Sequence, residues 1–276
     1  MALSTSLVGK VAIVTGSSRS IGAAIAQRLA EDGADVIINY VYNSQAASEV
    51  VNTINSRGKG RAASVQADAS SSIGANHLLE ETVKIFGRLD ILVLNAGIMG
   101  SKVLADVDER FFDEHITRNV KGPLFLTKAA VPLLPAGASI VHFNCIPLNS
   151  HPYIGGRIIF ISTSLTKASA VLPNALAYVA SKGAIEQISR VLAKDLGSRG
   201  ITVNTVSPGP VDTPLFRDGK TEQQIQFIAG LNPSNRLGLP EEIAPTIAFL
   251  ASPAATWING QNILVNGVSG LLPCLL

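Results

Sequence analysis

Tyr178 and Lys182 stand four residues apart, in the segment Tyr178-Val-Ala-Ser-Lys182, and these two side chains could transfer a proton. Residues spaced by four lie on one face of a helix, so the phenol and the ammonium group would be neighbours. A tyrosine with its ordinary pKa near 10 is a poor acid or base at neutral pH. A neighbouring cation stabilises the phenolate and lowers that pKa. The pair therefore predicts a proton-transfer site, although an exposed pair at this spacing is also a common surface feature.

A strand that runs through a small-residue turn into a helix lies far upstream of this pair. Val11–Val14 is a short apolar run typical of a buried strand, and the polar turn Thr15–Ser20 follows it. Ile21, Ile25 and Leu29 then recur every four residues, which predicts the core-facing side of a helix. Such a turn directs backbone N–H groups and the positive end of the helix dipole at one place, which suits a pyrophosphate. An ordinary connection rich in small residues would have the same composition.

Strands and helices alternate along the rest of the chain. The apolar runs predict strands at 11–14, 35–40, 62–67, 91–94, 158–161, 201–206 and 263–265, and helices between them, including 108–134, 175–196, 221–229 and 241–251. Buried strands in strict alternation with helices predict a parallel sheet covered on both faces. We therefore expect one α/β domain over residues 1–276, with a doubly wound, Rossmann-type sheet. Ligands bind beyond the carboxyl ends of such strands, where Gly16, Tyr40, Asp68 and Asn95 all fall.

Two segments compete for the fifth strand, Ser139–Phe143 and Arg157–Ser162. Only the second lies close before the tyrosine, so we assign the strand there. Residues 138–155 then look like an insertion of eighteen residues, because joining Gly137 to Gly156 would restore an ordinary helix-to-strand connection. A native insertion and a retained intron with a whole number of codons both fit. The insertion would lie at the amino end of the strand, opposite the ligand-binding edge, so we expect the chemistry to survive it.

The composition limits the classes of protein to consider. A hydrophobic content of 47% with 15% charged residues indicates a globular chain, and a net charge of +2 without basic clusters argues against a nucleic-acid partner. Cys145 and Cys274 are the only cysteines and the four histidines are scattered, so we expect neither a disulfide framework nor a metal site. The first residues lack the apolar core of a signal peptide and no run reaches membrane-spanning length, so we expect a cytoplasmic protein without a membrane partner.

Taken together, these motifs resemble the short-chain dehydrogenase/reductase family. The resemblance rests on residues 15–22 (TGSSRSIG), Asp68, 94–97 (LNAG), Asn119, a Ser/Thr cluster before Tyr178-x-x-x-Lys182, and 207–209 (SPG). Each motif is weak alone, but all of them follow the family's order over nearly the whole chain. Arg19, Asn39-Tyr40 and 257–260 (WING) make the chain similar to the fungal and plant ketone or aldehyde reductases of the family, of the tetrahydroxynaphthalene reductase and ketoacyl reductase type. The resemblance implies about seven strands in the order 3-2-1-4-5-6-7.

The same resemblance implies a catalytic role for several residues. Tyr178 would protonate the substrate carbonyl oxygen, and Lys182 would lower the tyrosine pKa and hold the ribose of the nicotinamide. Asn119 would kink its helix and hold a water that links Lys182 to solvent. A hydroxyl after the fifth strand would bond the same carbonyl oxygen. The spacing back from Tyr178 favours Ser164, whereas counting along the strand favours Thr163.

The implied cofactor is NADPH. The cofactor-binding residues that follow from the resemblance are Gly16, Ser18, Arg19, Ser20, Ile21, Tyr40, Asn43, Ser44, Ala67, Asp68, Asn95, Ala96, Gly97, Pro208, Gly209, Val211 and Thr213, together with Tyr178 and Lys182. An NAD-preferring site carries an acidic residue just after the second strand. This chain has Asn39-Tyr40 there and no carboxylate before Glu49, while Arg19 could contact the 2′-phosphate. We therefore expect NADPH to be preferred over NADH.

Two further positions depart from the family's pattern. Ser20 replaces the middle glycine of the turn, so a side chain stands where backbone would approach the phosphates. The tail reads Asn266-Gly267-Val268, where a second glycine is usual. A serine can bond phosphate, so we expect cofactor binding to survive the first departure.

We expect an NADPH-dependent carbonyl reductase that acts on a small molecule. Apolar residues within 214–237 either form a lid for a hydrophobic substrate or only pack their own short helix. The rival functions are epimerisation, dehydration or alcohol oxidation at the same site, and a cofactor-binding sensor without turnover. Helices 108–134 and 175–196 would pair with their copies, which predicts a homodimer or a homotetramer. The apolar residues available for that pairing are Val120, Leu124, Ile185, Ile188 and Val191, although some of them must face the sheet.

Overall fold

One parallel sheet of seven strands, in the order β3-β2-β1-β4-β5-β6-β7, forms the centre of the protein, which confirms the predicted fold. The computed structural model describes residues 4–136, 155–169 and 171–268. The strands are β1 (Val11–Val14), β2 (Asp35–Tyr40), β3 (Ala62–Gln66), β4 (Ile91–Leu94), β5 (Arg157–Ile161), β6 (Thr202–Pro208) and β7 (Asn262–Val265). All six neighbouring pairs are parallel, so the carboxyl ends of the strands lie at one edge.

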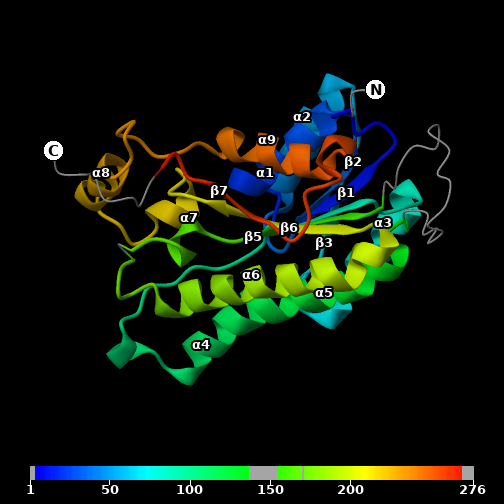
Figure 1. Ribbon diagram of the computed structural model, residues 1–276. Helices are drawn as coiled ribbons and strands as arrows, with labels where there is room; N and C mark the ends of the chain where they lie inside the picture. Colours follow the sequence, from blue (N-terminus) through cyan, green and yellow to red (C-terminus); the bar gives the residue numbers. More distant parts are fainter. Residues whose placement is uncertain (1–3, 137–154, 170, 269–276) are drawn as a thin grey trace.

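Helices cover both faces of this sheet (Figure 1). One face carries α1 (Ser20–Glu31), α2 (Ser44–Arg57) and α9 (Pro240–Ala251), and the other carries α3 (Ser72–Phe86), α5 (Gly122–Ala130) and α6 (Leu176–Leu196). The short helices α7 (Pro214–Arg217) and α8 (Glu222–Gly230) follow β6. Successive residues of each strand feed the two cores alternately, as Ile158 and Ile159 of β5 do. No helix in the described ranges is long and apolar enough to cross a bilayer.

The helix predicted over 108–134 is interrupted at its middle. It consists of α4 (Glu109–Ile116), a π-helical turn (Thr117–Lys121) and α5, and it ends in a 3₁₀ turn at Leu133. Asn119 lies within the π-helical turn and is buried. π-helical turns of this kind often mark functional sites, because the extra residue redirects one side chain. The expected distortion of the helix at Asn119 is therefore present.

The fifth strand is β5, as assigned from the sequence, and the competing segment 139–143 lies outside the described residues. The predicted insertion, 138–155, also lies outside them except for its last residue. The Gly156 N–H donates to the Pro135 carbonyl oxygen at 3.0 Å, so the chain on the two sides of 137–154 is in contact. This contact is what an insertion into an existing connection requires. The insertion itself, and the single domain over 1–276, stay predictions.

Candidate active site

The turn that follows β1, Thr15–Ser20 (the β1 turn), is held by neutral hydrogen bonds to β2. The Ser17 hydroxyl donates to the Val14 carbonyl at 2.7 Å and accepts the Asn39 N–H at 3.1 Å. The Gly16 N–H donates to the Asn39 side-chain oxygen at 3.2 Å. Gly16 has a φ of 63°, in the left-handed region where glycine is unstrained. The first glycine of the turn therefore has the conformation that a tight strand-to-helix connection needs.

The β1 turn is also tied to the end of β4. The Thr15 hydroxyl accepts the backbone N–H groups of Asn95 and Ala96, each at 3.0 Å. The Asn95 amide donates to the carbonyl oxygens of Thr15 and Gly16 at 2.9 and 3.1 Å. A Cβ on Gly22 would lie 2.4 Å from the Gly16 oxygen, so α1 can start this close to the strands only with glycine there. The structure thus brings together the predicted residues at the ends of β1 and β4.

Arg19 and Ser20 occupy the last positions of the β1 turn. Arg19 is exposed, and within the described ranges its side chain forms neither an ion pair nor a hydrogen bond. Ser20 is the first residue of α1 and has a φ of 53°, a conformation that an L-residue adopts only with strain. A guanidinium group beside a helix N-terminus suits an anion. Arg19 is therefore available to contact a phosphate group without giving up an existing partner.

The end of β2 differs from the expected arrangement at one residue. Asn39 is buried, and its amide donates to the Ala67 carbonyl at 3.0 Å, so this side chain joins strands and does not face a ribose. Tyr40 is half-buried at the strand end. Asn43 accepts the Ala46 N–H at 2.9 Å and caps α2, and Ser44 is exposed. The side-chain oxygen of Asn43 is therefore occupied by the helix cap.

Asp68 follows β3 and is half-buried. It accepts the backbone N–H of Ser70 at 3.0 Å and the Ser70 hydroxyl at 2.6 Å. Burial raises the pKa of Asp68, but these two hydrogen bonds and the positive charge of Arg118 outweigh that effect and leave the pKa below its ordinary value. The carboxylate is therefore ionised at neutral pH and can accept a hydrogen bond from an amino group.

Thr163 is the hydroxyl that the structure brings to Tyr178. The Thr163 side chain lies close enough to the tyrosine phenol to lower its pKa. Ser164 lies one residue further, buried in the 3₁₀ turn Ser164–Thr166. The structure therefore places Thr163 beside the phenol, and which of Thr163 and Ser164 supplies the catalytic hydroxyl stays a prediction.

Lys182, Asn119 and Gly97 converge beside this pair. The Lys182 ammonium group donates to the Ile161 carbonyl at 2.7 Å and lies 5.9 Å from the centre of the Tyr178 ring. A Cβ on Gly97 would lie 3.0 Å from the Asn119 side-chain oxygen and 3.3 Å from the lysine nitrogen. The absence of a side chain at Gly97 therefore leaves the lysine reachable from the strand ends.

Both polar atoms of the Asn119 side chain are hydrogen-bonded to neighbouring residues. Its side-chain oxygen accepts the Ile98 N–H, and its amide donates to the Ile98 carbonyl, both at 2.9 Å. The amide also donates to the Ser181 hydroxyl at 3.0 Å, and Ser181 directly precedes Lys182 on α6. Asn119 thus connects the segment after β4 to the helix that carries the tyrosine and the lysine.

Burial governs the pKa of both groups on α6. Burial raises the pKa of Tyr178 to about 12, and the hydrogen bond from Thr163 opposes this only in part. Burial also lowers the pKa of Lys182 to about 8. Burial therefore dominates the pKa of the phenol in the protein by itself, and the expectation that the lysine, helped by the positive charge of a nicotinamide, lowers that pKa stays a prediction. A phenol that stays protonated at neutral pH can still act as a proton donor.

The segment after β6 closes the site on its other side. Pro208 ends β6, and the Gly209 N–H donates to the Val265 carbonyl at 3.0 Å. A Cβ on Gly209 would lie 2.8 Å from the backbone of Asn266, so only glycine fits there. Val211 and Thr213 are buried, and the Thr213 hydroxyl caps α7 by accepting the Phe216 N–H at 3.1 Å. The four predicted residues of this segment therefore determine the path of the chain at the carboxyl edge of the sheet.

The residues present fit a dinucleotide cofactor. Glycines stand where α1 and the chain after β4 come closest to the strand ends, Arg19 is unpaired within the described part of the chain, and Lys182 is reachable past Gly97. Beside them, a protonated phenol with a bonded hydroxyl can give a proton to an oxygen. The described ranges hold no group of three His, Cys, Asp or Glu side chains placed to bind a metal ion.

Sequence reasoning did not predict the structural roles of three polar residues that hold this site together. They are Thr15, Asn39 and Glu186, of which Glu186 is buried on α6, one turn after Lys182. A polar residue inside the apolar run of β2 was a usable signal for Asn39. A carboxylate next to Ile185, on the core-facing stripe of α6, was a signal for Glu186.

Comparisons with known proteins agree with this geometry. Residues 10–224 match the family model described as short chain dehydrogenase. The chain is 39% identical to an NADPH-dependent aldehyde reductase-like protein, chloroplastic, from Arabidopsis thaliana, over 95% of this chain and 94% of that protein. It is also 39% identical to a versicolorin reductase from Emericella nidulans, over 95% and 96%. A solved short chain dehydrogenase from Burkholderia cenocepacia in complex with NADP superimposes with a TM-score of 0.83, at 34% identity over 96% of this chain and 99% of that chain.

Proposed function

The chain belongs to the short-chain dehydrogenase family, and on that premise we propose that it reduces a ketone or an aldehyde with NADPH. The observation that carries the proposal is the convergence of Thr163, Tyr178 and Lys182 at the carboxyl edge of the sheet. A donor, its hydroxyl partner and a cation in one place form a site for protonating an oxygen while its carbon is reduced.

NADPH would supply the hydride to the carbonyl carbon. Tyr178 is protonated at neutral pH, and it gives its proton to the carbonyl oxygen as negative charge develops there. Thr163, which lies beside the phenol, turns its single hydroxyl hydrogen to the same oxygen. Lys182 is largely protonated at pH 7, because its pKa is about 8, and it binds the hydroxyls of the nicotinamide ribose. Orientation of the two reactants supplies much of the acceleration.

The cofactor-binding residues follow from the site. We assign the pyrophosphate to the β1 turn and the start of α1, the adenine amino group to Asp68, and the 2′-phosphate to Arg19. The Arabidopsis relative is named for NADPH and the Burkholderia structure contains NADP, which supports the choice of cofactor. The lack of a carboxylate at the end of β2 removes the repulsion that would otherwise act on the 2′-phosphate.

The substrate we propose is hydrophobic, of the kind found in secondary metabolism. Leu215 on α7 is 45% exposed and Phe227 on α8 is 68% exposed, whereas Ile225 is buried and packs α8. The segment 214–237 therefore has apolar side chains left over after packing its own helices, which favours the lid over the purely structural alternative. The Emericella relative is named a versicolorin reductase, so its named substrate is a small molecule.

We also propose a homodimer or a homotetramer. Exposed apolar side chains lie along α4, α5 and α6, among them Phe112, Phe125 and Val191. Ile185 is buried in the core, so it is not available for the pairing to which the sequence assigned it. Light scattering at micromolar concentration tests this, and a stable monomer would contradict it. The cytoplasmic location and the fungal origin stay predictions.

The deciding experiment is a panel of ketones and aldehydes with the purified protein, followed by the loss of NADPH absorbance. We expect turnover of hydrophobic carbonyl compounds, and turnover lower by about a hundredfold or more in the Tyr178→Phe variant. Substrate conversion without NADPH loss would indicate epimerisation or dehydration, and NADPH binding without any turnover would indicate a sensor. Either result overturns the proposed reduction.

A further inference from the structure

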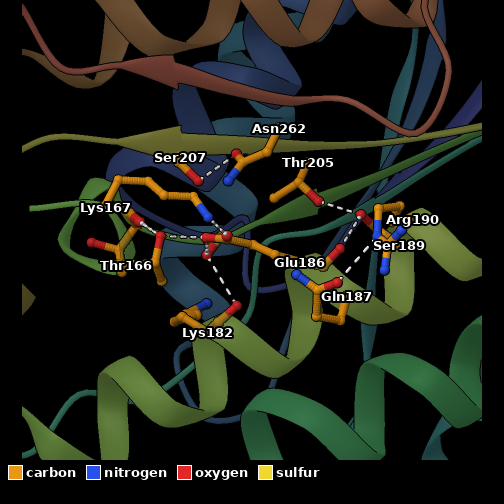
Figure 2. Close-up of polar contacts among 12 residues, drawn as sticks. Thr166, Lys167, Lys182, Glu186, Gln187, Ser189, Arg190, Thr205, Ser207 and Asn262 are labelled. Atoms are coloured by element: carbon orange, nitrogen blue, oxygen red, sulfur yellow. Dashed lines mark hydrogen bonds and ion pairs between the residues drawn. The ribbon is translucent and has the colours of Figure 1, made fainter.

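Glu186 has a buried carboxylate one helical turn after Lys182, with its side chain only 5% exposed (Figure 2). It accepts the Ser162 hydroxyl at 2.9 Å and the Thr166 hydroxyl through a very short hydrogen bond, and it forms an ion pair with Lys167 at 3.2 Å. Removing a carboxylate from water is costly unless it is fully hydrogen-bonded. The three donors supply those bonds, so this buried charge is tolerated.

All three donors lie on one short stretch, Ser162–Lys167, which we call the β5 turn. Ser162 comes directly before Thr163, and Thr166 comes three residues after it. One carboxylate therefore holds the turn on both sides of Thr163. The Thr166 hydroxyl also lies 2.9 Å from the Thr163 carbonyl, and the Ser162 hydroxyl lies 3.2 Å from the Lys182 carbonyl. The turn is thereby fixed to α6, the helix that carries Tyr178.

From these contacts we propose that Glu186 is a positioning residue, which holds the Thr163 hydroxyl against Tyr178. Glu186 does not touch the phenol or the lysine nitrogen in any contact described above, so it acts through the β5 turn. The inference rests on the proposed function, because it assigns the turn a part in the same reduction.

The buried hydroxyl bonds carry this effect more than the ion pair does. The Lys167 side chain is 54% exposed, and an ion pair with an exposed partner is screened by solvent. The Ser162 and Thr166 hydroxyls bond a charged acceptor away from water, and such bonds are stronger than neutral ones. A glutamine would keep one acceptor oxygen and turn an NH₂ group toward donors, so the charge as well as the shape is needed.

The matched control is Ser189→Ala, one turn further along α6. The Ser189 hydroxyl bonds the Thr205 hydroxyl of β6 at 2.6 Å, so its loss also removes a buried polar contact between α6 and the sheet (Figure 2). That contact does not touch the β5 turn. Glu186→Ala and Ser189→Ala are both expected to unfold at lower urea concentration. Only Glu186→Ala is expected to lower kcat, by about tenfold to a hundredfold, which is the cost of a misplaced catalytic group.

The assay uses 2-tetralone and 4-nitrobenzaldehyde as carbonyl probes, with NADPH binding measured separately by fluorescence. The dissociation constant of NADPH is expected to change less than about twofold in Glu186→Ala. Unchanged kcat in Glu186→Ala would overturn the inference. So would an equal loss of kcat in Ser189→Ala, because a general loosening of α6 would then explain both. If Glu186→Ala does not fold, Glu186→Gln and Thr166→Val make the same comparison, each with kcat lower by about threefold or more.

A double-mutant cycle separates this inference from the proposed function. If Glu186 acts through Thr163, the double variant Thr163→Val/Glu186→Ala is no slower than Thr163→Val alone, whereas independent effects would multiply. Multiplying effects would overturn the inference and leave the reduction intact. Wild-type kcat in Thr163→Val would instead overturn the assigned catalytic hydroxyl in the proposed function, whatever Glu186→Ala does.

Discussion

The β1 turn and the β5 turn are equally short and follow two strands of one sheet that are separated by β4, yet different forces hold them. The β1 turn is held by uncharged groups, through Ser17, Asn39 and Thr15, and its one cation, Arg19, is exposed. The β5 turn is held by the buried charge of Glu186, and its donors on both sides of Thr163 are all occupied.

The difference follows from what each turn would contact. A turn that binds an anion gains from donors and a cation that have no partner until the ligand arrives. A turn that presents one hydroxyl to a phenol gains from having every other polar group satisfied, since the remaining hydroxyl then has one orientation. If this comparison is right, substitutions in the β5 region change turnover, and substitutions in the β1 turn change cofactor choice and stability.

Tyr178→Phe makes the largest change on the β5 side. The ring still packs while the proton donor is gone, so kcat is expected to fall by about a hundredfold to ten-thousandfold. The NADPH dissociation constant is expected to stay within about twofold, because the hydroxyl is not needed for packing. Stopped-flow or steady-state NADPH consumption gives the first quantity, and fluorescence titration gives the second. Near-wild-type turnover would remove the tyrosine from its assigned role.

Lys182→Met changes the pH dependence of stability. The pKa of Lys182 is about 8 in the folded protein and near 10.5 when unfolded, so between these values the unfolded chain binds the extra proton. Stability of the wild type therefore rises with pH across that window, and the methionine variant lacks this rise. Between pH 7.5 and pH 10 the wild type is expected to gain about 1–3 kcal/mol relative to the variant in urea unfolding.

The same variant has a second readout in activity. Lys182→Met should weaken both NADPH binding and turnover, since the lysine is assigned to the ribose and lies beside the tyrosine. The surface variant Lys194→Met, three turns further along α6, serves as the control for losing a lysine from this helix. If the free energy of unfolding changed with pH in the same way for the wild type and for Lys182→Met, the Lys182 side chain would not be desolvated in the folded protein.

Arg19→Ala tests the β1 side. A charge-assisted contact to the 2′-phosphate contributes about 1.5–3 kcal/mol, so the wild type is expected to prefer NADPH by at least about tenfold in kcat/KM. The alanine variant should lose most of that preference while its kcat with NADPH at saturation changes little. Equal use of both cofactors by the wild type would contradict the assignment of Arg19 and of the β2 end.

The strands that position the site could be predicted from the sequence, because a buried strand is recognised from a local run of apolar residues. β1, β2 and β4 have the predicted bounds, and the strand order is the predicted one. Residues at strand ends, such as Gly16 and Asn95, then had to meet at one edge. The choice between Thr163 and Ser164 could not be made this way, since it depends on the path of an irregular turn.

The burial of a side chain is the other quantity that the spacing of residues in the sequence does not predict. The four-residue interval placed Tyr178 and Lys182 on one helix face, and they are there. The spacing does not give the pKa of the tyrosine, because that pKa depends on how much water the fold excludes. Asn39 and Glu186 show the same limit, since each looks like an ordinary polar residue until its partners from distant segments are known.

The two positions where the family's glycine is replaced give the smallest expected effect. Ser20 and Val268 have φ values of 53° and 67°, in the left-handed region that glycine occupies freely. The left-handed conformation at these two positions explains why the family's pattern has glycine there. This chain keeps that conformation but has a serine and a valine at the two positions. An L-residue in this region costs about 1–2 kcal/mol, and more for a β-branched one, while glycine adds entropy to the unfolded chain.

Ser20→Gly and Val268→Gly are therefore each expected to raise the free energy of unfolding by about 0.5–1 kcal/mol, the strain relieved less the entropy gained by the unfolded chain. Ser18→Gly is the matched control in the same β1 turn, because Ser18 does not have a positive φ, and there the glycine should destabilise by about 0.5–1 kcal/mol. Urea unfolding at pH 7 measures all three. If Ser20→Gly lowered stability as Ser18→Gly does, the left-handed conformation of Ser20 would not be strained. The comparison between the β1 turn and the β5 turn would then lose its support on the β1 side.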